Sequence, residues 1–217
     1  MTGLLRKAAL TACGLAVAAT AFAGVPSPGN SSMSASCIRL VNKDAGGVAA
    51  PNGAFTVTVR DLANNPIANS TVVLDFNNCA VPADIRVQNG GQPAGLVQNC
   101  AAHTVRLSSN ASGQVTFIVV GGAQNAGNGP GATAACARVI ADGVNLGSVA
   151  VAAFDGNGAG GLSPGDIGAL VGDLFGSFKS RSDLDCSGAL SPADIGALVS
   201  QLFGAYNQPL SGAFCNP

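Results

Sequence analysis

The chain has 217 residues with ten basic and eleven acidic side chains, so its formal net charge is −1. No cluster of basic residues runs through it, which argues against a protein that binds nucleic acid. All eleven acidic residues are aspartates, and six of them lie between residues 155 and 194, so negative charge is concentrated toward the C-terminus.

Residues 1–23 have the pattern of an export signal. Arg6 and Lys7 precede an apolar run, and residues 21–23 form an A-x-A cleavage site. The apolar run is shorter than the roughly 20 residues that span a bilayer, so no transmembrane segment is expected. Residues 24–36, rich in Pro, Gly and Ser, are predicted to form a flexible leader. The protein is therefore expected to be secreted or held at the cell surface.

Six cysteines remain after cleavage of the signal, and an even number in an exported chain indicates three disulfides. Many pairings are compatible with these spacings, so the connectivity stays open. The pairs that we favour are Cys79–Cys100, Cys37–Cys136 and Cys186–Cys215. No C-x-x-C motif occurs, which gives no support to a zinc site or a thiol-redox site.

Residues 37–153 alternate β-type segments with turn residues. Strict period-two alternation occurs in residues 55–60, 71–76 and 114–120. The side chains predicted to face inward are Phe55, Val57, Val59, Val72, Leu74, Phe76, Val115, Phe117 and Val119. Shorter candidate strands are residues 38–41, 85–87, 104–107, 135–141 and 149–154. The pattern predicts a mainly β fold, an antiparallel immunoglobulin-like β-sandwich.

The stretch VTVRDLANNPIANSTVVLDF, with NASGQVTF and ARVIADG further along, resembles the bacterial immunoglobulin-like domains of invasin-type surface proteins. Those domains carry a similar D-x-x-x-N-P turn between two strands and a Gly-centred turn before another. The resemblance covers part of residues 37–153. It implies a spacer or an adhesive unit.

Two near-copies of one segment follow, and their leading aspartates, Asp155 and Asp183, start two potential calcium loops. Calcium takes six to eight oxygen ligands, and a twelve-residue loop supplies them from positions 1, 3, 5, 7, 9 and 12. In the first loop these positions are Asp155, Asn157, Ala159, the carbonyl of Gly161, Ser163 and Asp166. In the second loop they are Asp183, Asp185, Ser187, the carbonyl of Ala189, Ser191 and Asp194. Gly160 and Gly188 at position 6 permit the sharp turn.

The two loops differ in their number of ligands. Ala159 cannot coordinate through its side chain, and the first loop has one carboxylate fewer than the second. The first loop is therefore expected to bind calcium more weakly than the second.

Each loop leads into an amphipathic helix. Ser163 and Ser191 are predicted N-caps, each followed by Pro at the first helical position and Asp at the third. Apolar residues then recur with helical spacing. The two stripes are Ile167, Leu170, Val171, Leu174, Phe175 and Ile195, Leu198, Val199, Leu202, Phe203. We expect the stripes to bury each other about a local two-fold axis.

Duplicated loop-plus-exit-helix units with Asp at both loop ends, and with no entering helix, resemble the dockerin family. The resemblance covers about residues 154–206, and residues 154–217 form the module that it implies. Dockerin repeats bind calcium and dock a protein that bears a cohesin domain. Loop positions 10 and 11 hold Pro164-Gly165 and Pro192-Ala193, where dockerins often have hydroxyl residues. Calcium binding therefore carries over better than cohesin recognition.

Catalysis is not expected. Nucleophile–base chemistry would need His103, the only histidine, which is predicted to be a surface or turn residue. The sequence favours a secreted, non-catalytic binding or assembly protein that docks onto a larger extracellular complex. The alternative is a structural surface, matrix or adhesive protein that self-associates and whose calcium repeats only rigidify the tail. A small hydrolase carried by the tail is the third hypothesis.

Overall fold

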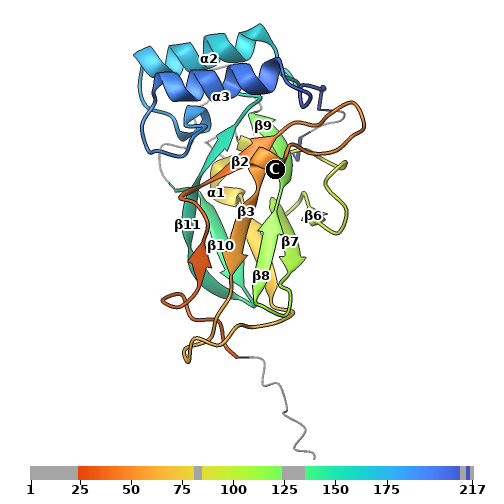
Figure 1. The fold of residues 1–217 in the computed structure, drawn as a ribbon, viewed down its shortest axis with the longest axis vertical. Helices are drawn as coiled ribbons and strands as arrows, with labels where there is room; N and C mark the ends of the chain where they lie inside the picture. The colour runs from red at the N-terminus through yellow and green to blue at the C-terminus, as the bar shows by residue number, and fades with distance from the viewer. Residues whose placement is uncertain (1–23, 81–84, 124–134, 211–213, 216–217) are drawn as a thin grey trace, which may run out of the picture.

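The computed structural model describes residues 24–80, 85–123, 135–210 and 214–215, and the predicted export signal, residues 1–23, lies outside them. The strands are β1 (Ser32–Met33), β2 (Cys37–Val41), β3 (Phe55–Thr58), β4 (Thr71–Asp75), β5 (Ile85–Val87), β6 (Val97–Asn99), β7 (Thr104–Ser108), β8 (Gln114–Phe117), β9 (Val119–Ala123), β10 (Ala137–Ala141) and β11 (Val144–Ala153). The helices are η1 (Pro51–Gly53), α1 (Asn77–Ala80), α2 (Pro164–Phe175), η2 (Ser180–Ser182) and α3 (Pro192–Leu202). The fold is therefore mainly β, with the two long helices near the C-terminus (Figure 1).

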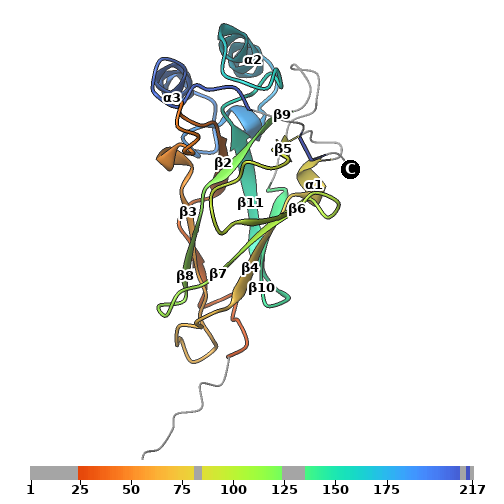
Figure 2. The same cartoon turned by 90° about the vertical axis from the view of Figure 1, so that its right-hand side faces the viewer.

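The strands form two sheets. One has three strands in the order β1-β3-β8, and the other has eight in the order β5-β9-β2-β11-β10-β4-β7-β6. The larger sheet curls, so that β4, β7 and β10 face the three-stranded sheet (Figure 2). The prediction of a mainly β fold is confirmed, but the architecture is a curled sheet with a smaller one against it, not a clear immunoglobulin-like sandwich.

The prediction that all strands pair antiparallel is wrong at β2. This strand runs parallel to both of its neighbours, with Cys37 opposite Ala150 of β11 and Leu40 opposite Val119 of β9. Alternation in a sequence shows which face of a strand is buried, but it does not encode the direction of the neighbouring strand. All residues of β9 are buried, as is typical of parallel strands that are covered on both faces.

The inward faces of the alternating segments are confirmed. All nine side chains that the alternation placed inward are at most 6% exposed. They pack together in one core cluster between the two sheets, joined by Ile38, Val105, Val139 and Val151. Period-two patterning was therefore sufficient to locate this core.

A second buried cluster connects the helices to the larger sheet. It contains Val41 and Val120 from the sheet, Phe154, which follows β11, and Leu170 and Leu198 from the helices. As a result α2 and α3 lie side by side at one end of the molecule, beyond the ends of β2 and β9 (Figures 1 and 2). The division of the chain into a sandwich ending at residue 153 and a separate module stays a prediction.

The disulfides differ from the three pairs favoured on sequence grounds. The observed pairs are Cys37–Cys186, Cys79–Cys136 and Cys100–Cys215. The tail does not close on itself, because it folds back onto the sheet, where the backbone N–H of Cys215 donates to the carbonyl of Val87. Cys186 and Cys215 therefore meet cysteines of the β region instead of each other.

Part of the predicted leader belongs to the fold. In β1, Ser32 and Met33 pair antiparallel with Thr58 and Val57 of β3. The Asn30 side chain also donates hydrogen bonds to backbone carbonyls of the turn that follows β3. These residues extend the smaller sheet by one short strand.

Candidate metal centre

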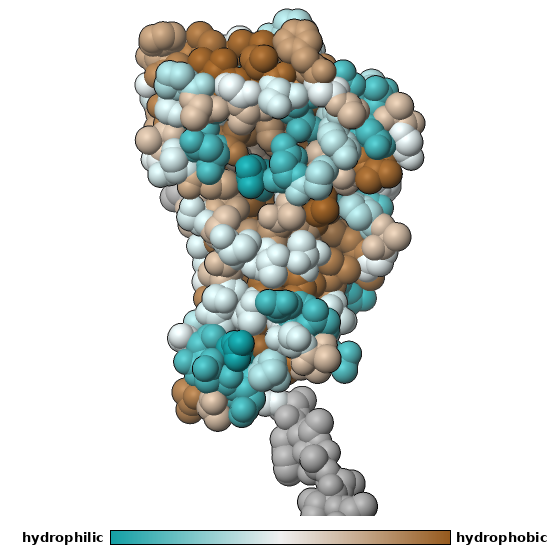
Figure 3. Space-filling model, in the orientation of Figure 1, coloured by the Kyte–Doolittle hydropathy of each residue, from teal (hydrophilic) through white to brown (hydrophobic). Residues whose placement is uncertain are grey.

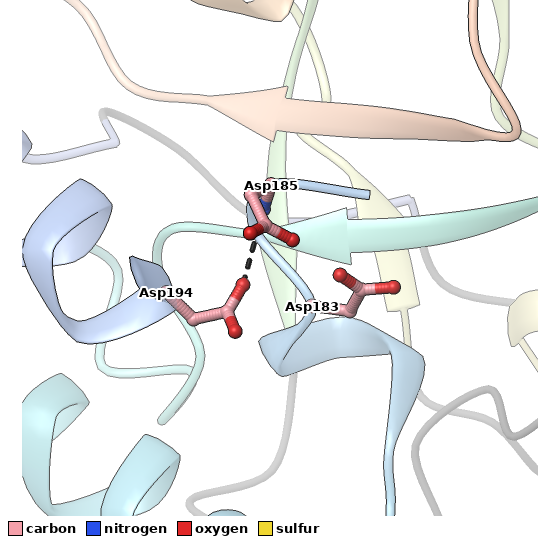
Figure 4. Close-up of side chains that lie close together, drawn as sticks. All are labelled: Asp183, Asp185 and Asp194. Carbon is pink, nitrogen blue, oxygen red and sulfur yellow. Dashed lines mark hydrogen bonds between the residues drawn. The ribbon is translucent and has the colours of Figure 1, made fainter. Parts of the chain in front are cut away.

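Three carboxylates of the second loop converge. One oxygen from each of Asp183, Asp185 and Asp194 lies within 4.8 Å of the others. Figure 4 shows the three side chains close together at the start of α3. Calcium–oxygen distances are about 2.4 Å, so two ligands of one ion stand at most about 4.8 Å apart. All three carboxylates can therefore contact a single divalent ion.

Backbone N–H groups of the second loop hold these carboxylates in place. Asp183 Oδ1 accepts from Ser187 N at 3.0 Å, and Asp183 Oδ2 accepts from Gly188 N at 2.9 Å. Asp194 reaches back along the loop to accept from Asp185 N at 3.1 Å and from Ser191 N at 2.8 Å. Gly188 has a φ of 84°, the left-handed conformation expected of a glycine at position 6. The chain thus wraps around the two terminal carboxylates.

The first loop repeats this geometry at equivalent positions. Asp155 Oδ2 accepts from Gly160 N at 3.0 Å, and Gly160 has a φ of 81°. Asp166 accepts from Asn157 N at 3.0 Å and from Ser163 N at 2.7 Å. Both exit helices begin with the predicted capping box and with Pro in the first turn. The two segments therefore share one local structure, as their sequence similarity predicts.

One oxygen of the first loop is buried without a partner. Asp155 is 0% exposed, and its Oδ1 makes no hydrogen bond to the described residues. Burial, followed by the nearby charge of Asp166, raises the pKa of Asp155 to about 7. Burial also raises the pKa of Asp166, which is 1% exposed. Buried polar atoms are almost always paired, so this oxygen is a position for a water molecule, a proton or a cation.

The other predicted ligands of the first loop contact one another. Asn157 Oδ1 accepts from Ala159 N at 2.8 Å, and Asn157 Nδ2 donates to Ser163 Oγ at 3.2 Å. Gly161 packs against Pro209, which a Cβ at this position would meet at 3.1 Å. The carbonyl of Gly160, beside it, accepts from Leu210 N at 2.7 Å. The segment that follows α3 therefore closes over the first loop.

The second loop is the more open of the two. Ser187 Oγ donates to the carbonyl of Ala189 at 3.0 Å, so two predicted ligands are paired with each other. Asp185 is exposed, and hydrogen bonding to Ser187 lowers its pKa. Burial raises the pKa of Asp183, which is 3% exposed. The donor set of each loop consists of oxygen atoms, which fits calcium better than the softer metals.

A buried ion pair next to the second loop was not predicted. Arg181 Nε and Nη2 donate to the two carboxylate oxygens of Asp173 at 2.8 and 3.0 Å, and Ser182 Oγ donates to Asp173 at 2.7 Å. Arg181 is 1% exposed and Asp173 is 5% exposed. The cluster joins the end of α2 to the turn before Asp183, so it holds the start of the second loop in place. Asp173 lies seven residues after Asp166 and so on the same face of the helix, and this spacing could have predicted its burial from the sequence.

The sheet holds both loops. Cys186 at position 4 of the second loop forms the disulfide with Cys37 of β2. Arg39 of β2 also donates to the carbonyl of Leu184 at 3.4 Å. The carbonyl of Asp155 accepts from Ala123 N of β9 at 2.8 Å. Each loop is therefore anchored to a strand of the larger sheet.

His103 lies in a turn, as predicted, but its side chain is buried and not on the surface. It is 5% exposed, and its backbone φ is 50°. Burial, followed by the charge of Arg86, lowers the pKa of its imidazole. The buried imidazole therefore belongs to the turn that leads into β7.

Comparisons with known proteins do not assign the chain to a family. No family model matches the chain, and no curated protein matches it. A solved structure of the Yersinia pseudotuberculosis adhesin InvE is 19% identical with a TM-score of 0.25, over 60% of this chain and 28% of that chain. A likeness at this TM-score establishes neither a shared fold nor a shared function. Among the described residues, no helix is long and apolar enough to cross a bilayer.

Proposed function

We propose that the chain is a secreted, non-catalytic binding or assembly protein in which residues 154–217 form a dockerin-like, calcium-binding module. The observation that carries the proposal is Oδ1 of Asp155, which has no hydrogen-bond partner among the described residues and is buried close to a second buried carboxylate. A divalent ion would neutralise both aspartates and supply the missing partner. The convergence of three carboxylates in the second loop supports a second ion.

The three disulfides support export, because such bonds form and persist in oxidising compartments. In this proposal the module docks the protein onto a larger extracellular complex, with a cohesin-type scaffold protein as the partner. The helices that follow the loops support docking, since they lie together at one end of the molecule and leave apolar side chains exposed.

A second function is favoured by the anchoring of the loops. The Cys37–Cys186 disulfide and the contact of Arg39 with Leu184 tie the second loop to β2. Calcium bound there would stiffen the junction between sheet and helices without any partner. In that case the protein is a structural surface, matrix or adhesive protein whose repeats only rigidify its tail.

Calcium titration of the EDTA-treated, disulfide-intact protein tests the proposal. Isothermal titration calorimetry is expected to find two sites, with a rise in helicity by circular dichroism and in melting temperature. Asp142→Asn is a matched control, because it removes one carboxylate in the β10–β11 turn and leaves an oxygen to accept from Thr71 N. No heat of binding and no change in melting temperature would contradict calcium binding.

The two functions are separated by affinity capture with the full chain, with and without calcium. Calcium-dependent capture of a protein with a cohesin domain, identified by mass spectrometry, would support docking. A calcium-dependent melting temperature without such a partner would support the rigidifying role.

A further inference from the structure

Within the described structure, α2 and α3 carry no exposed charged side chain. The only charged residues of the two helices are Asp166, Asp173 and Asp194, and each is at most 5% exposed. The helical residues that do face solvent are Pro164, Gly165, Gly168, Gly172, Phe175, Pro192, Ala193, Gly196 and Ser200, and Phe203 follows them. We call this surface the helical face. A helix at the surface of a soluble protein ordinarily turns a charged side toward water, so a neutral face indicates a contact surface.

Two phenylalanines dominate the helical face. Phe175 is 85% exposed and Phe203 is 80% exposed, and they occupy equivalent positions of the two repeats. The expectation that the apolar stripes bury each other is therefore met only in part, since Leu170 and Leu198 are buried while both phenylalanines are not. Figure 3 shows apolar residues gathered at this end of the molecule.

The arrangement of the helices gives the face an internal symmetry. The carbonyl of Gly160, before α2, accepts from Leu210 N, after α3. At the other end, Phe178, after α2, and Leu190, before α3, line one pocket. Each helix therefore begins near the point where the other ends. This antiparallel arrangement places Phe175 and Phe203 toward opposite ends of the face.

We propose that the helical face binds the helical face of a second copy of this chain, so that two molecules form a symmetric dimer. The proposal goes beyond docking to a scaffold, because it assigns the same surface to a second copy, and it rests on the proposed calcium binding, which would order the helices. The exposed side chains of α2 and α3 offer a charged partner no complementary charge. The charges that border α2, Lys179 and Arg181, are paired with Asp173. A second copy offers a matching neutral, apolar surface, and the same patch on both subunits is what a two-fold interface requires. No exposed charged side chain of α2 or α3 would be desolvated on either side.

The size of the face determines how tight the dimer is. Two helices of 12 and 11 residues cover a footprint of roughly 400 Å² at about 1.5 Å per residue and about 10 Å between axes. Two exposed phenylalanines contribute about 300 Å² of apolar surface. Stable interfaces bury about 800 Å² per partner. The dimer is therefore expected to be weak, with a dissociation constant of about 1–100 μM.

Sedimentation velocity on the disulfide-intact chain in saturating calcium, from about 1 to 500 μM, tests the dimer. The expected result is a concentration-dependent dimer that the double variant Phe175→Glu, Phe203→Glu weakens at least about 30-fold. Leu62→Glu is the matched control. Leu62 is 86% exposed in the turn after β3, and its replacement is expected to leave the dimer unchanged. Phe175→Ser with Phe203→Ser is a second, uncharged pair, and circular dichroism verifies that each variant folds.

Several outcomes would overturn the dimer. A wild-type chain that stays monomeric over the whole range would do so, as would a double variant that dimerises as well as wild type. A monomer that floats with neutral phosphatidylcholine vesicles would assign the helical face to a lipid surface instead. Calcium titration of the same samples separates the two proposals, because a calcium-loaded monomer contradicts only the dimer.

Discussion

The two loops share a backbone and differ in their surroundings. In the first loop both carboxylates are almost fully buried, Asp155 at 0% and Asp166 at 1% exposed. The second loop offers three carboxylates, and one of them, Asp185, is exposed. Ligand number favours calcium binding at the second loop, whereas burial makes an empty first loop more costly. The calcium affinity of a loop and the free-energy cost of leaving it empty can therefore differ between two closely similar sequences.

The loops also differ in how they are tied to the sheet. The first follows β11 without interruption, and the carbonyl of Asp155 pairs with Ala123 N of β9. The second follows η2, which the buried Asp173–Arg181 pair holds, and its fourth residue is joined to β2 by a disulfide. The first loop is held by its continuity with a strand, and the second by side-chain bonds. Perturbing the sheet or the disulfide should therefore affect the two loops unequally.

The largest expected effect comes from removing the first aspartate of each loop. Asp183→Ala should weaken calcium binding at the second loop by about 100-fold or more, since it deletes one of three charged ligands. Asp155→Ala should reduce the overall calcium affinity less, because the first loop is the weaker site. Competition titration with a calcium indicator measures both, with Asp142→Asn as control. The reverse order of effects would show that burial, not ligand number, ranks the two sites.

The pH dependence of the calcium-free protein tests the burial of the first loop. The pKa of Asp155 is raised from 3.8 to about 7 in the fold, so the folded state holds a proton that the unfolded chain releases. The contribution of Asp155 to the free energy of unfolding is fully present below about pH 4 and is lost as the pH rises toward 7. In EDTA, unfolding at pH 8 should need about 2 kcal/mol less than at pH 5.5, a fall in Tm of about 5 °C.

Two further measurements complete the pH test. Asp155→Asn should reduce the dependence, since the amide does not titrate, while Asp166 and Asp183, whose pKa values are also raised by burial, should retain part of it. Saturating calcium should reverse it, because a higher pH removes the proton that competes for the same oxygens. A calcium-free protein whose Tm rises between pH 5.5 and 8 would contradict the assigned burial of Asp155.

Local sequence patterns predicted the features that depend on neighbours along the chain. Alternation located the inward side chains of β3, β4 and β8, such as Phe55 and Leu74. Ser, Pro and Asp at fixed offsets located the start of both helices, and glycine at position 6 located the left-handed turns. Each of these depends on periodicity or on a hydrogen bond within a few residues, which a single sequence contains.

Features that depend on distant partners could not be predicted. The parallel pairing of β2 depends on the placement of β9 and β11. The choice of Cys186 for Cys37 depends on the return of the tail onto the sheet. The burial of Arg181 follows from the same packing, and in the sequence it stands in a short polar stretch. The exposure of Phe175 likewise depends on how the helix rotates against the sheet, which its apolar spacing leaves open.

Loss of the Cys37–Cys186 disulfide should affect the two loops unequally. Cys186 has a φ of 62°, an uncommon conformation that its place in the loop requires. In the variant Cys37→Ser, Cys186→Ser, the second loop should bind calcium about 10-fold more weakly, because it is less preorganised. The first loop should keep its affinity. The pair Cys79→Ser, Cys136→Ser is the control, since it removes a disulfide far from the loops in sequence. Equal weakening of both loops would contradict independent anchoring.

The smallest expected effect is an exchange at loop position 5, where the two repeats differ by one hydroxyl. Ala159→Ser should tighten the first loop about 3-fold by adding a neutral oxygen ligand, and Ala159 is exposed, so the hydroxyl meets no steric obstacle. Ser187→Ala should weaken the second loop by a similar factor. It also removes the hydroxyl that donates to the Ala189 carbonyl and frees that oxygen for the ion, which limits the loss.

Calorimetry on both single variants and on the double exchange measures these changes against wild type. If position 5 carries the difference, the double exchange should bring the two affinities closer together. If the affinities stay apart, the third carboxylate, Asp185, accounts for the difference, and Asp185→Asn should then remove it. Either result would show which ligand distinguishes the two loops. Their backbone contacts to the terminal aspartates are the same, except that Asp183 Oδ1 accepts from Ser187 N and Asp155 Oδ1 has no such partner among the described residues.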